Sequence, residues 1–325
     1  MSKPKVLVTR RVPQECLDLL KKHFELEHYD KGTAIPRKRL LKSVKDKDGL
    51  LCLLTDRIDS ELLAAGPGLK AVSTFSVGYD HIDVPACKAR GVSVTNTPGV
   101  LTESTADFTW ALLMAAARRV VEGDAYMRGG RYKGWDPLML LGTDVFGQTL
   151  GIIGFGRIGQ AVAKRAGGFS MRVLYYDTRR AAPEAETALN AKFVPLDELL
   201  RESDYVSVHT VLDEGTRHLL DDRAFGLMKR SACLINAARG PIVDEKALVR
   251  ALKSDRIRGA GLDVYEWEPK MAPGLASCKN AVLAPHLASA TLETRRKMGM
   301  MAASGLVDAL ICGARSPYAV DEQPA

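Results

Sequence analysis

The chain has 325 residues, of which 46% are hydrophobic, 26% are charged and 6% are aromatic. This composition is typical of a globular protein and excludes a disordered, collagen-like or coiled-coil chain. The length predicts about two domains. The best hydrophobic run ends at Arg118, well short of the roughly 18 apolar residues that cross a bilayer, so we expect no membrane association.

The net charge is +7, from 46 Lys and Arg against 39 Asp and Glu. Such an excess can indicate a nucleic-acid or anionic-lipid partner. The basic clusters at 37–39, 179–180 and 295–297 are far apart, however, and none is interleaved with aromatic residues, as a platform for single strands would be. We therefore expect no nucleic-acid partner and a mild preference for small anionic ligands.

Six cysteines are spread along the chain without a C-x-x-C pair or a close Cys/His cluster. This distribution disfavours a structural zinc site or a disulfide framework, so we expect reduced, mostly buried thiols and no bound metal. An apolar strand is expected from Lys5, which leaves no room for a signal or transit peptide, and the last three residues are not a peroxisomal signal. We therefore expect a cytoplasmic protein.

Short apolar, β-branched runs alternate with helical patterns over nearly the whole chain, which indicates βαβ units and parallel sheets. A first series predicts a small α/β domain with strands at 5–9, 50–54, 71–75 and 92–96 and helices at 14–23, 36–45, 60–64 and 84–90.

A second series begins after residues 97–99. Thr102 can cap a helix that Glu103 begins with a favourable negative charge, and this helix is apolar on several faces, as expected between domains or subunits. A Gly/Pro-rich loop follows at 128–143. The remaining predicted elements are strands at 149–153, 172–176, 205–209, 233–236, 259–264 and 281–284 and a long helix at 291–312.

Residues 154–159 match G-x-G-x-x-G directly after a predicted strand and at the start of a predicted helix. In this context Gly154 permits a tight turn, Gly156 lets the backbone approach a pyrophosphate, and Gly159 lets the helix pack close to the strand. The helix N-terminus at Arg157 and Ile158 supplies free N–H groups. The motif therefore predicts dinucleotide binding.

Asp177 ends the next predicted strand, 18 residues beyond Gly159. This is the expected place of the carboxylate that binds the adenosine ribose hydroxyls. Its charge would repel a 2′-phosphate and favours NAD, whereas Arg179 and Arg180 could bind that phosphate, so NADP remains an alternative.

Three further residues stand at or just beyond predicted strand ends: Arg239, Glu268 and His286. Reduction of a 2-keto acid needs a guanidinium to hold the carboxylate and polarise the carbonyl. It also needs an imidazolium as proton donor and a carboxylate to orient it. Each residue alone has another interpretation, as a solvated loop charge, an extended residue before proline or a half-buried histidine.

Several motifs, in order along the chain, resemble those of the D-isomer-specific 2-hydroxyacid dehydrogenases. They are the glycine motif and the segments 76–83 (SVGYDHID), 236–240 (NAARG), 261–269 (GLDV with a later EP) and 285–290 (PHLASA). Within that family the chain looks most like the glyoxylate/hydroxypyruvate reductases, through residues 53–56 and 134–147.

The resemblance implies an α/β fold of two doubly wound parallel-sheet domains, Rossmann or flavodoxin-like, with a cleft between them. Residues 1–99 and 288–325 would form the substrate domain and residues 100–287 the dinucleotide-binding domain. The implied activity is NAD(P)H-dependent reduction of a small 2-keto acid, glyoxylate or hydroxypyruvate, to the D-2-hydroxy acid. The implied assembly is a homodimer formed through the cofactor domain.

The resemblance also implies roles for individual residues. Arg239 would bind and polarise the substrate, and Glu268 would pair with the acid/base His286. Val77 and Gly78 would offer backbone N–H groups to the substrate carboxylate. The residues implied near the nicotinamide and the cofactor are Thr105, Ala237 and Asp263.

Three positions remain ambiguous. His209 ends a predicted strand and either lines the dinucleotide site or is a surface residue. Trp135 lies in the loop that, in glyoxylate-reductase-like relatives, lies near the partner's substrate cleft, and a packing role is its alternative. Ala288 stands where relatives often have Gly, and its smaller backbone freedom could alter the pocket wall.

Other functions are possible on this fold. NAD-binding transcriptional corepressors keep a similar Arg/Glu/His set, but the chain has no long Pro/Ser-rich extension. Phosphite dehydrogenases have a Lys where this chain has Val77. Phosphoglycerate dehydrogenases with regulatory tails are disfavoured because about a dozen residues follow the last predicted helix. A D-lactate dehydrogenase is a further alternative.

Overall fold

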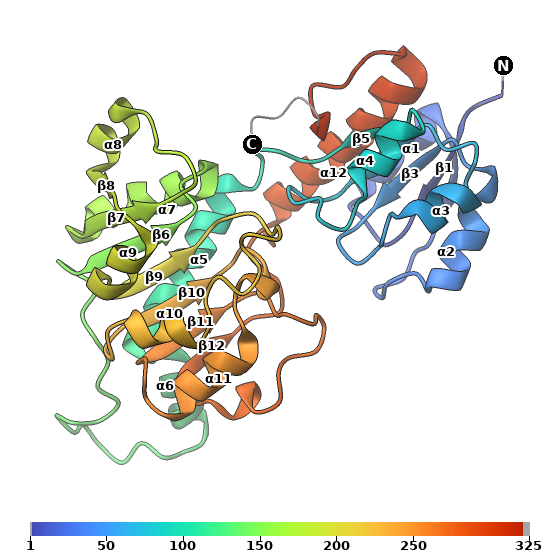
Figure 1. Ribbon diagram of the computed structural model, residues 1–325. Coiled ribbons are helices and arrows are strands. Elements are labelled where there is room, and N and C mark those ends of the chain that lie inside the picture. The colour runs from blue at the N-terminus through green and yellow to red at the C-terminus, as the bar shows by residue number, and fades with distance from the viewer. Residues whose placement is uncertain (1, 321–325) are drawn as a thin grey trace. The chain divides into compact units, whose positions relative to one another are not determined.

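The computed structural model describes residues 2–320, and the chain divides into two compact units (Figure 1). The first unit ends at Leu101 and resumes at Ala290, and the second spans Thr102–Ser289. The sequence-based boundaries stand two residues earlier, at 99/100 and 287/288. Each unit is a parallel sheet with helices on both faces, so the predicted α/β fold class is confirmed.

Within the described residues, the first unit has a five-stranded parallel sheet in the order β2-β1-β3-β4-β5, which is the flavodoxin-like order. Its strands are β1 (Lys5–Val8), β2 (Glu25–His28), β3 (Gly49–Cys52), β4 (Ala71–Thr74) and β5 (Ser93–Thr95). Its helices are α1 (Gln14–His23), α2 (Arg37–Ser43), α3 (Ser60–Ala65), α4 (Val84–Ala89) and α12 (Leu292–Val307), with short turns at Val44–Asp46 and Asp308–Cys312.

Alternate strand residues bury the two faces of this sheet. Leu50 and Val72, which pair across β3 and β4, pack with Leu62 of α3 in one core. On the other face α12 contacts β3 and β4 and packs against α1. A Cβ added at Gly49 of β3 would lie 3.5 Å from Leu306, so α12 lies directly on the sheet.

The strand β2 was not expected from the sequence. Its residues Glu25, Glu27 and His28 are polar, and none of the four residues of the strand is fully buried. An edge strand hydrogen-bonds to one neighbour and needs no hydrophobic alternation, so its sequence carries little signal.

The second unit has a seven-stranded parallel sheet in the order β12-β11-β10-β9-β6-β7-β8, all of it within Thr102–Ser289. The strands are β6 (Thr149–Ile153), β7 (Arg172–Tyr176), β8 (Ala191–Phe193), β9 (Tyr205–Val208), β10 (Cys233–Asn236), β11 (Gly259–Leu262) and β12 (Ala281–Leu283). The helices are α5 (Thr102–Arg118), α6 (Val120–Arg128), α7 (Arg157–Ala166), α8 (Pro183–Leu189), α9 (Leu196–Glu202), α10 (Asp222–Leu227) and α11 (Glu245–Lys253), with short turns at Gly167–Phe169, Gly240–Ile242 and Leu275–Ser277.

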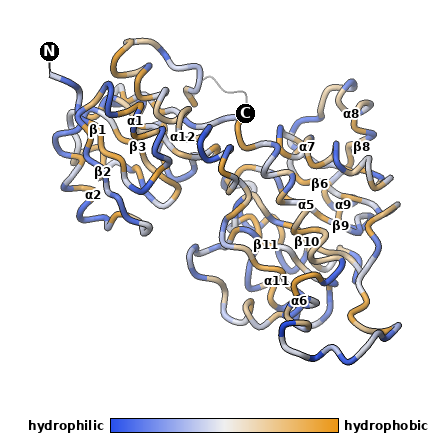
Figure 2. Tube along the Cα trace, turned by 180° about the vertical axis from the view of Figure 1, so that it is seen from behind, coloured by the Kyte–Doolittle hydropathy of each residue, from blue (hydrophilic) through white to orange (hydrophobic). Residues whose placement is uncertain are grey.

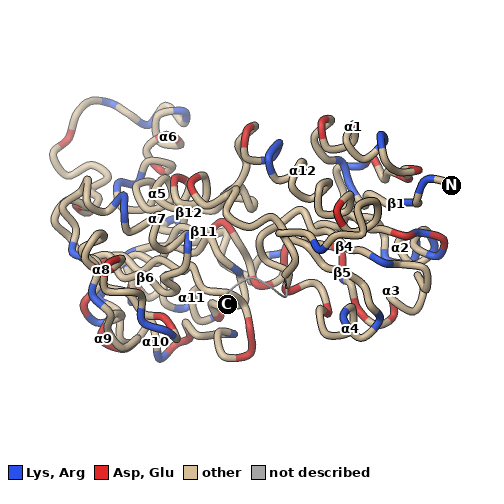
Figure 3. The backbone as a smooth tube through the Cα atoms, turned by 90° about the horizontal axis from the view of Figure 1, so that it is seen from above, with Lys and Arg blue, Asp and Glu red and all other residues tan. Residues whose placement is uncertain are grey.

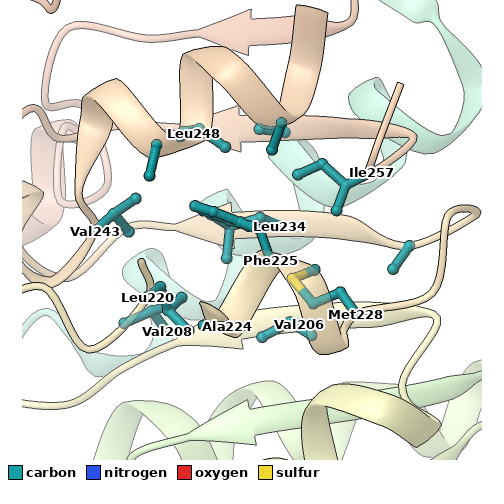
Figure 4. Close-up of a cluster of buried hydrophobic side chains, with 14 of the residues drawn as sticks. Val206, Val208, Leu220, Ala224, Phe225, Met228, Leu234, Val243, Leu248 and Ile257 are labelled. Carbon is teal, nitrogen blue, oxygen red and sulfur yellow. The ribbon is translucent and has the colours of Figure 1, made fainter. Parts of the chain in front are cut away.

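The helices of this unit bury both faces of its sheet. α5 packs on α7, β10 and β11, and Thr102 is its first residue, not the cap that the sequence predicted. On the opposite face, Phe225 of α10 and Leu248 of α11 pack against Val206 and Leu234 of β9 and β10 (Figure 4). The strand order reverses between β6 and β9, and ligands of doubly wound folds bind at the carboxyl ends of strands at such a point.

The edge strand β8 was not predicted from the sequence either, whereas the predicted Gly/Pro-rich loop is present. The loop after α6 has no helix or strand before β6, in a stretch that the structure describes throughout. In each unit, hydrophobic residues concentrate on the strands and inner helices (Figure 2), and basic and acidic residues are interspersed (Figure 3). All six cysteines are free, and five are buried. No helix in residues 2–320 is long and apolar enough to cross a membrane.

Candidate active site

The three glycines of the 154–159 turn differ in how much space a side chain would have. Gly154 has φ +91°, and a Cβ there would lie 2.5 Å from the backbone nitrogen of Thr210. A Cβ on Gly159 would lie 2.2 Å from the carbonyl oxygen of Gly154. At Gly156, by contrast, a Cβ would meet no atom within 4 Å. The fold of the chain alone therefore explains Gly154 and Gly159, whereas Gly156 borders open space.

The N-terminus of α7 is ready to bind an anion. Gly156 is the N-cap and supplies no side-chain acceptor. The backbone N–H groups of Arg157 and Ile158 have no acceptor among residues 2–320. Free N–H groups and the positive end of the helix dipole favour a phosphate, and the open space at Gly156 leaves room for one. These residues fit the pyrophosphate of a dinucleotide.

Asp177 follows β7 and is tied to the glycine turn, because its Oδ2 accepts a 2.7 Å hydrogen bond from the Phe155 N–H. Of the two arginines beyond it, Arg180 makes two 2.9 Å hydrogen bonds to the Glu186 carboxylate. Arg179 is exposed and has no ion-pair partner within the described chain. The acidic side chain therefore lies at the turn, and one arginine nearby remains available to a phosphate.

His286 and Glu268, predicted as the proton donor and its orienting carboxylate, are in contact. His286 Nδ1 lies 3.0 Å from Glu268 Oε2, and the Tyr265 N–H donates to Glu268 Oε1, also at 3.0 Å. Burial opposes ionisation of Glu268, but His286, the Tyr265 N–H and Arg239 together hold its pKa below the ordinary value. Glu268 is thus an ionised carboxylate that fixes Nδ1 of the imidazole. Nε2 of His286 has no partner in the part of the chain that the structure describes.

The turn that carries His286 is held by Asp263. His286 has φ +57°, and its N–H donates to the carbonyl oxygen of Asp263 at 2.9 Å. The Asp263 side chain is fully buried, and its two carboxylate oxygens accept the N–H groups of Leu287 and Ala288 at 2.6 and 2.8 Å. Burial raises the pKa of Asp263, and these donors oppose that rise. The side chain predicted to contact the nicotinamide therefore shapes the His286 turn.

Arg239 follows β10 in a turn organised by Asn236. The Asn236 side chain accepts the Ala238 N–H and donates to the Arg239 carbonyl, both at 3.0 Å. A Cβ on Gly240 would lie 1.9 Å from the carbonyl carbon of Tyr265, so the two backbones touch. This contact places the Arg239 segment against the segment that carries Glu268.

Within the first unit, the loop at Val77 and Gly78 has open N–H groups. The carbonyl of Val77 accepts from Asn96 Nδ2, and that of Gly78 accepts from Ser76 Oγ, both at 2.7 Å. The N–H groups of Val77 and Gly78 have no acceptor in residues 2–320. With its carbonyls held, the loop offers two donors to a carboxylate.

Comparison with known proteins fits this geometry. Residues 110–288 match the family model described as D-isomer specific 2-hydroxyacid dehydrogenase, NAD binding domain. A glyoxylate reductase from Korarchaeum cryptofilum is 52% identical over 308 residues, which cover 94% of this chain and 92% of that protein. The chain belongs to the D-isomer specific 2-hydroxyacid dehydrogenases. It is therefore an oxidoreductase that uses NAD or NADP, and the family, enzyme and cofactor predictions are confirmed.

Solved structures of similar proteins agree with this family. The protein TT0316 from Thermus thermophilus has a TM-score of 0.90 and 47% identity, covering 97% of this chain and 99% of that chain. A glyoxylate/hydroxypyruvate reductase from Sinorhizobium meliloti, described as NADPH-dependent and in complex with NADP and malonate, has a TM-score of 0.87 and 32% identity, covering 99% and 98% of the two chains.

Two further positions in the dehydrogenase are clarified by the structure. His209 is not a plain surface residue: its Nε2 lies 2.7 Å from Ser207 Oγ, and a Cβ on Gly154 would lie 2.6 Å from its carbonyl carbon. Burial lowers the pKa of His209 to about 3, so the imidazole is neutral. Trp135 is 80% exposed, so it has no packing role within its own chain.

The remaining predicted residues lie in the same unit, and some important ones were not predicted. Thr105 is buried on α5, and Ala237 is half-buried after β10. Sequence reasoning missed Tyr265, whose N–H holds Glu268 and whose hydroxyl donates to the Ala284 carbonyl at 2.9 Å. It also missed the role of Asn236. The indication in the sequence was that Asn236 is the first residue of the segment 236–240, which contains Arg239.

Proposed function

We propose that this dehydrogenase reduces glyoxylate, and the related 2-keto acid hydroxypyruvate, with a reduced nicotinamide dinucleotide. The product is the 2-hydroxy acid, of D configuration where a stereocentre forms. The observation that carries the proposal is the His286–Glu268 pair, 3.0 Å apart, in which Nε2 of the imidazole is left for a substrate. The relative named glyoxylate reductase, at 52% identity, supports this choice of keto acid.

Each catalytic residue has one task in the proposed reaction. When bound, the reduced nicotinamide supplies the hydride for the keto carbon. Arg239 binds the substrate carboxylate and polarises its carbonyl. In the first unit, the N–H groups of Val77 and Gly78 are the proposed donors to a substrate carboxylate. His286 gives the proton on Nε2 to the carbonyl oxygen, while Glu268 keeps the ring oriented through Nδ1.

We propose further that the chain holds the dinucleotide through the α7 N-terminus and Asp177. Arg157 and Ile158 would donate to the pyrophosphate, and Asp177 would accept from the ribose hydroxyls. Thr105, Ala237 and Asp263 are proposed to border the nicotinamide, Asp263 chiefly through the His286 turn that it holds.

A panel of 2-keto acids at fixed NADH tests the proposed substrate. We expect the highest kcat/KM with glyoxylate and hydroxypyruvate and lower values with longer or branched keto acids. Reduction confined to bulky keto acids would reject the assignment.

The preference between NADH and NADPH is a separate proposal. We expect wild-type enzyme to prefer NADH because Asp177 repels a 2′-phosphate. The variant Asp177→Ala should narrow the preference for NADH over NADPH. The variant Arg179→Ala should lower kcat/KM for NADPH below that of the wild-type enzyme, because Arg179 has no ion-pair partner within the described residues and is available to a 2′-phosphate. Steady-state kinetics with both cofactors measure this, and a clear NADPH preference of the wild-type enzyme would overturn it.

We also propose a cytoplasmic homodimer. The six free thiols are typical of a reducing compartment. Val120, Val121, Met127, Trp135 and Leu138 are all more than half exposed in the single chain and cluster in sequence on α6 and the loop that follows it. Exposed apolar groups of this kind are typical of an interface, and the second copy of the chain is the proposed partner.

A further inference from the structure

A second set of ionisable residues lies behind the catalytic carboxylate. Glu245 is the first residue of α11 and is 3% exposed, and the Glu266 side chain, two residues before Glu268, is 7% exposed. His218 completes the set, with its Nε2 at 2.8 Å from Glu266 Oε1. None of these three residues has a task in the proposed reaction.

The two glutamates hold each other's backbone. Glu245 Oε2 accepts the Glu266 N–H at 2.9 Å, and Glu266 Oε2 lies 3.4 Å from the Glu245 N–H. The other oxygen of Glu245 accepts the Ala272 N–H at 2.8 Å. The Glu245 carboxylate thus fixes two points of the segment 265–272, and Glu268 lies between them.

The same set reaches the Arg239 segment. The His218 N–H donates to the Pro241 carbonyl at 2.8 Å, two residues beyond Arg239. His218 therefore connects the two segments: its side chain contacts Glu266, and its own backbone N–H is bonded to the segment that carries Arg239. The Arg239 and Glu268 segments are tied together twice, by this connection and by the backbone contact at Gly240.

Burial of a carboxylate costs folding free energy unless hydrogen bonds satisfy its oxygens. The Glu245 and Glu266 carboxylates are therefore held in place by the N–H groups that they accept. We propose that Glu245 and Glu266 are positioning residues for catalysis: they hold the segment 265–272 so that Glu268 meets His286, and His218 braces Glu266 against the Arg239 segment. The proposal rests on the proposed function, since it assumes that His286 is the proton donor.

Loosening the segment should change the ionisation of Glu268 as well as the rate. Burial opposes the ionised form of Glu268, and His286, the Tyr265 N–H and Arg239 favour it. If Glu268 moves away from these partners, their lowering effect is lost and the pKa of Glu268 rises. The acid limb of kcat/KM for keto-acid reduction then moves to higher pH. A role in stability alone would leave that limb in place.

The test uses the full-length variant Glu245→Gln, in which one of the two accepting oxygens becomes an amide that cannot accept an N–H. We expect kcat/KM for glyoxylate to fall roughly 10-fold or more, the acid limb to move to higher pH, and the Kd for NADH to stay within about twofold. Glu266→Gln should show the same change, but smaller, because its amide oxygen can still accept from His218. Glu184→Gln on α8, an exposed glutamate, is the matched control and should change neither parameter.

Two results would overturn the proposal. One is a wild-type pH profile and kcat/KM in Glu245→Gln. The other is a lowered melting temperature with unchanged kinetics, which would make the set purely structural. If Glu245→Gln does not fold, His218→Ala decides by the same two parameters, since its side chain is 40% exposed and its loss leaves Glu245 intact. Failure of the proposed function is recognised separately, because the wild-type enzyme would then not reduce glyoxylate.

Discussion

The two oxygens of Glu268 have different tasks. Oε1 accepts the Tyr265 N–H and fixes the carboxylate to its own segment, and Oε2 faces Nδ1 of His286. Because both oxygens are held, the imidazole has one orientation, with Nε2 available for proton transfer. Asp263 performs the corresponding task for the histidine backbone, by accepting the two N–H groups that follow it.

His209 should make the enzyme sensitive to acid. Its pKa is lowered by burial to about 3 from an ordinary value of 6.5. The unfolded chain therefore binds a proton at this residue between these values, and the folded chain does not. His209 therefore does not reduce the free energy of unfolding above pH 6.5. As the pH drops below that value, the free energy of unfolding falls, by up to about 2 kcal/mol at pH 5.

Urea unfolding at pH 8 and pH 5 tests this effect. The loss of unfolding free energy between the two pH values should be smaller in His209→Gln, which keeps a polar group near Ser207 but does not titrate. An equal loss in the variant and the wild-type enzyme would show that His209 is not the responsible group.

At the scale of elements, the turn between β6 and α7 contains one glycine that backbone packing requires, Gly159, and one that only ligand binding would require, Gly156. We predict that Gly156→Ala leaves the melting temperature within about 2 °C of wild type, since its Cβ meets nothing within 4 Å, and raises the Kd for NADH roughly 10-fold or more because the methyl group blocks the pyrophosphate. Gly159→Ala should instead destabilise the fold, because its Cβ would lie 2.2 Å from a carbonyl oxygen.

Thermal unfolding and NADH fluorescence titration of both variants measure this difference. Gly226→Ala on α10, where a Cβ also meets no atom within 4 Å, is the control and should retain NADH binding. Unchanged NADH affinity in Gly156→Ala would mean that the dinucleotide does not approach this turn.

Functional residues could be predicted from the sequence where a single short motif defines their positions. The glycine turn and Asp177 could be predicted because a fixed spacing defines their geometry. Arg239, Glu268 and His286 could be singled out at strand ends, but their roles came from the family resemblance, because each residue alone has another interpretation. Tyr265 and Glu245 could not, because they act through backbone N–H groups brought near by folding. The edge strand β2 was missed because its polar residues need no hydrophobic pattern.

At the scale of the whole molecule, the second α/β unit interrupts the first in sequence, and α12 returns to cover one face of the first sheet. The exposed apolar residues of α6 and the loop after it predict a dimer of twice the 35.4 kDa chain mass. Leu138→Asp, at a position 76% exposed in the single chain, should shift sedimentation velocity to the monomer. Leu292→Asp, at 96% exposure on α12, should not. A dimer that persists in Leu138→Asp would place the interface elsewhere.

The central claim is that His286 protonates the keto acid. The most direct measurement is glyoxylate reduction by His286→Ala, followed by NADH absorbance, with NADH binding measured on the same preparation. We predict that kcat falls by roughly 10²- to 10⁴-fold while the Kd for NADH is unchanged, as expected for loss of a general acid. A variant that binds NADH normally and reduces glyoxylate near the wild-type rate would contradict the account.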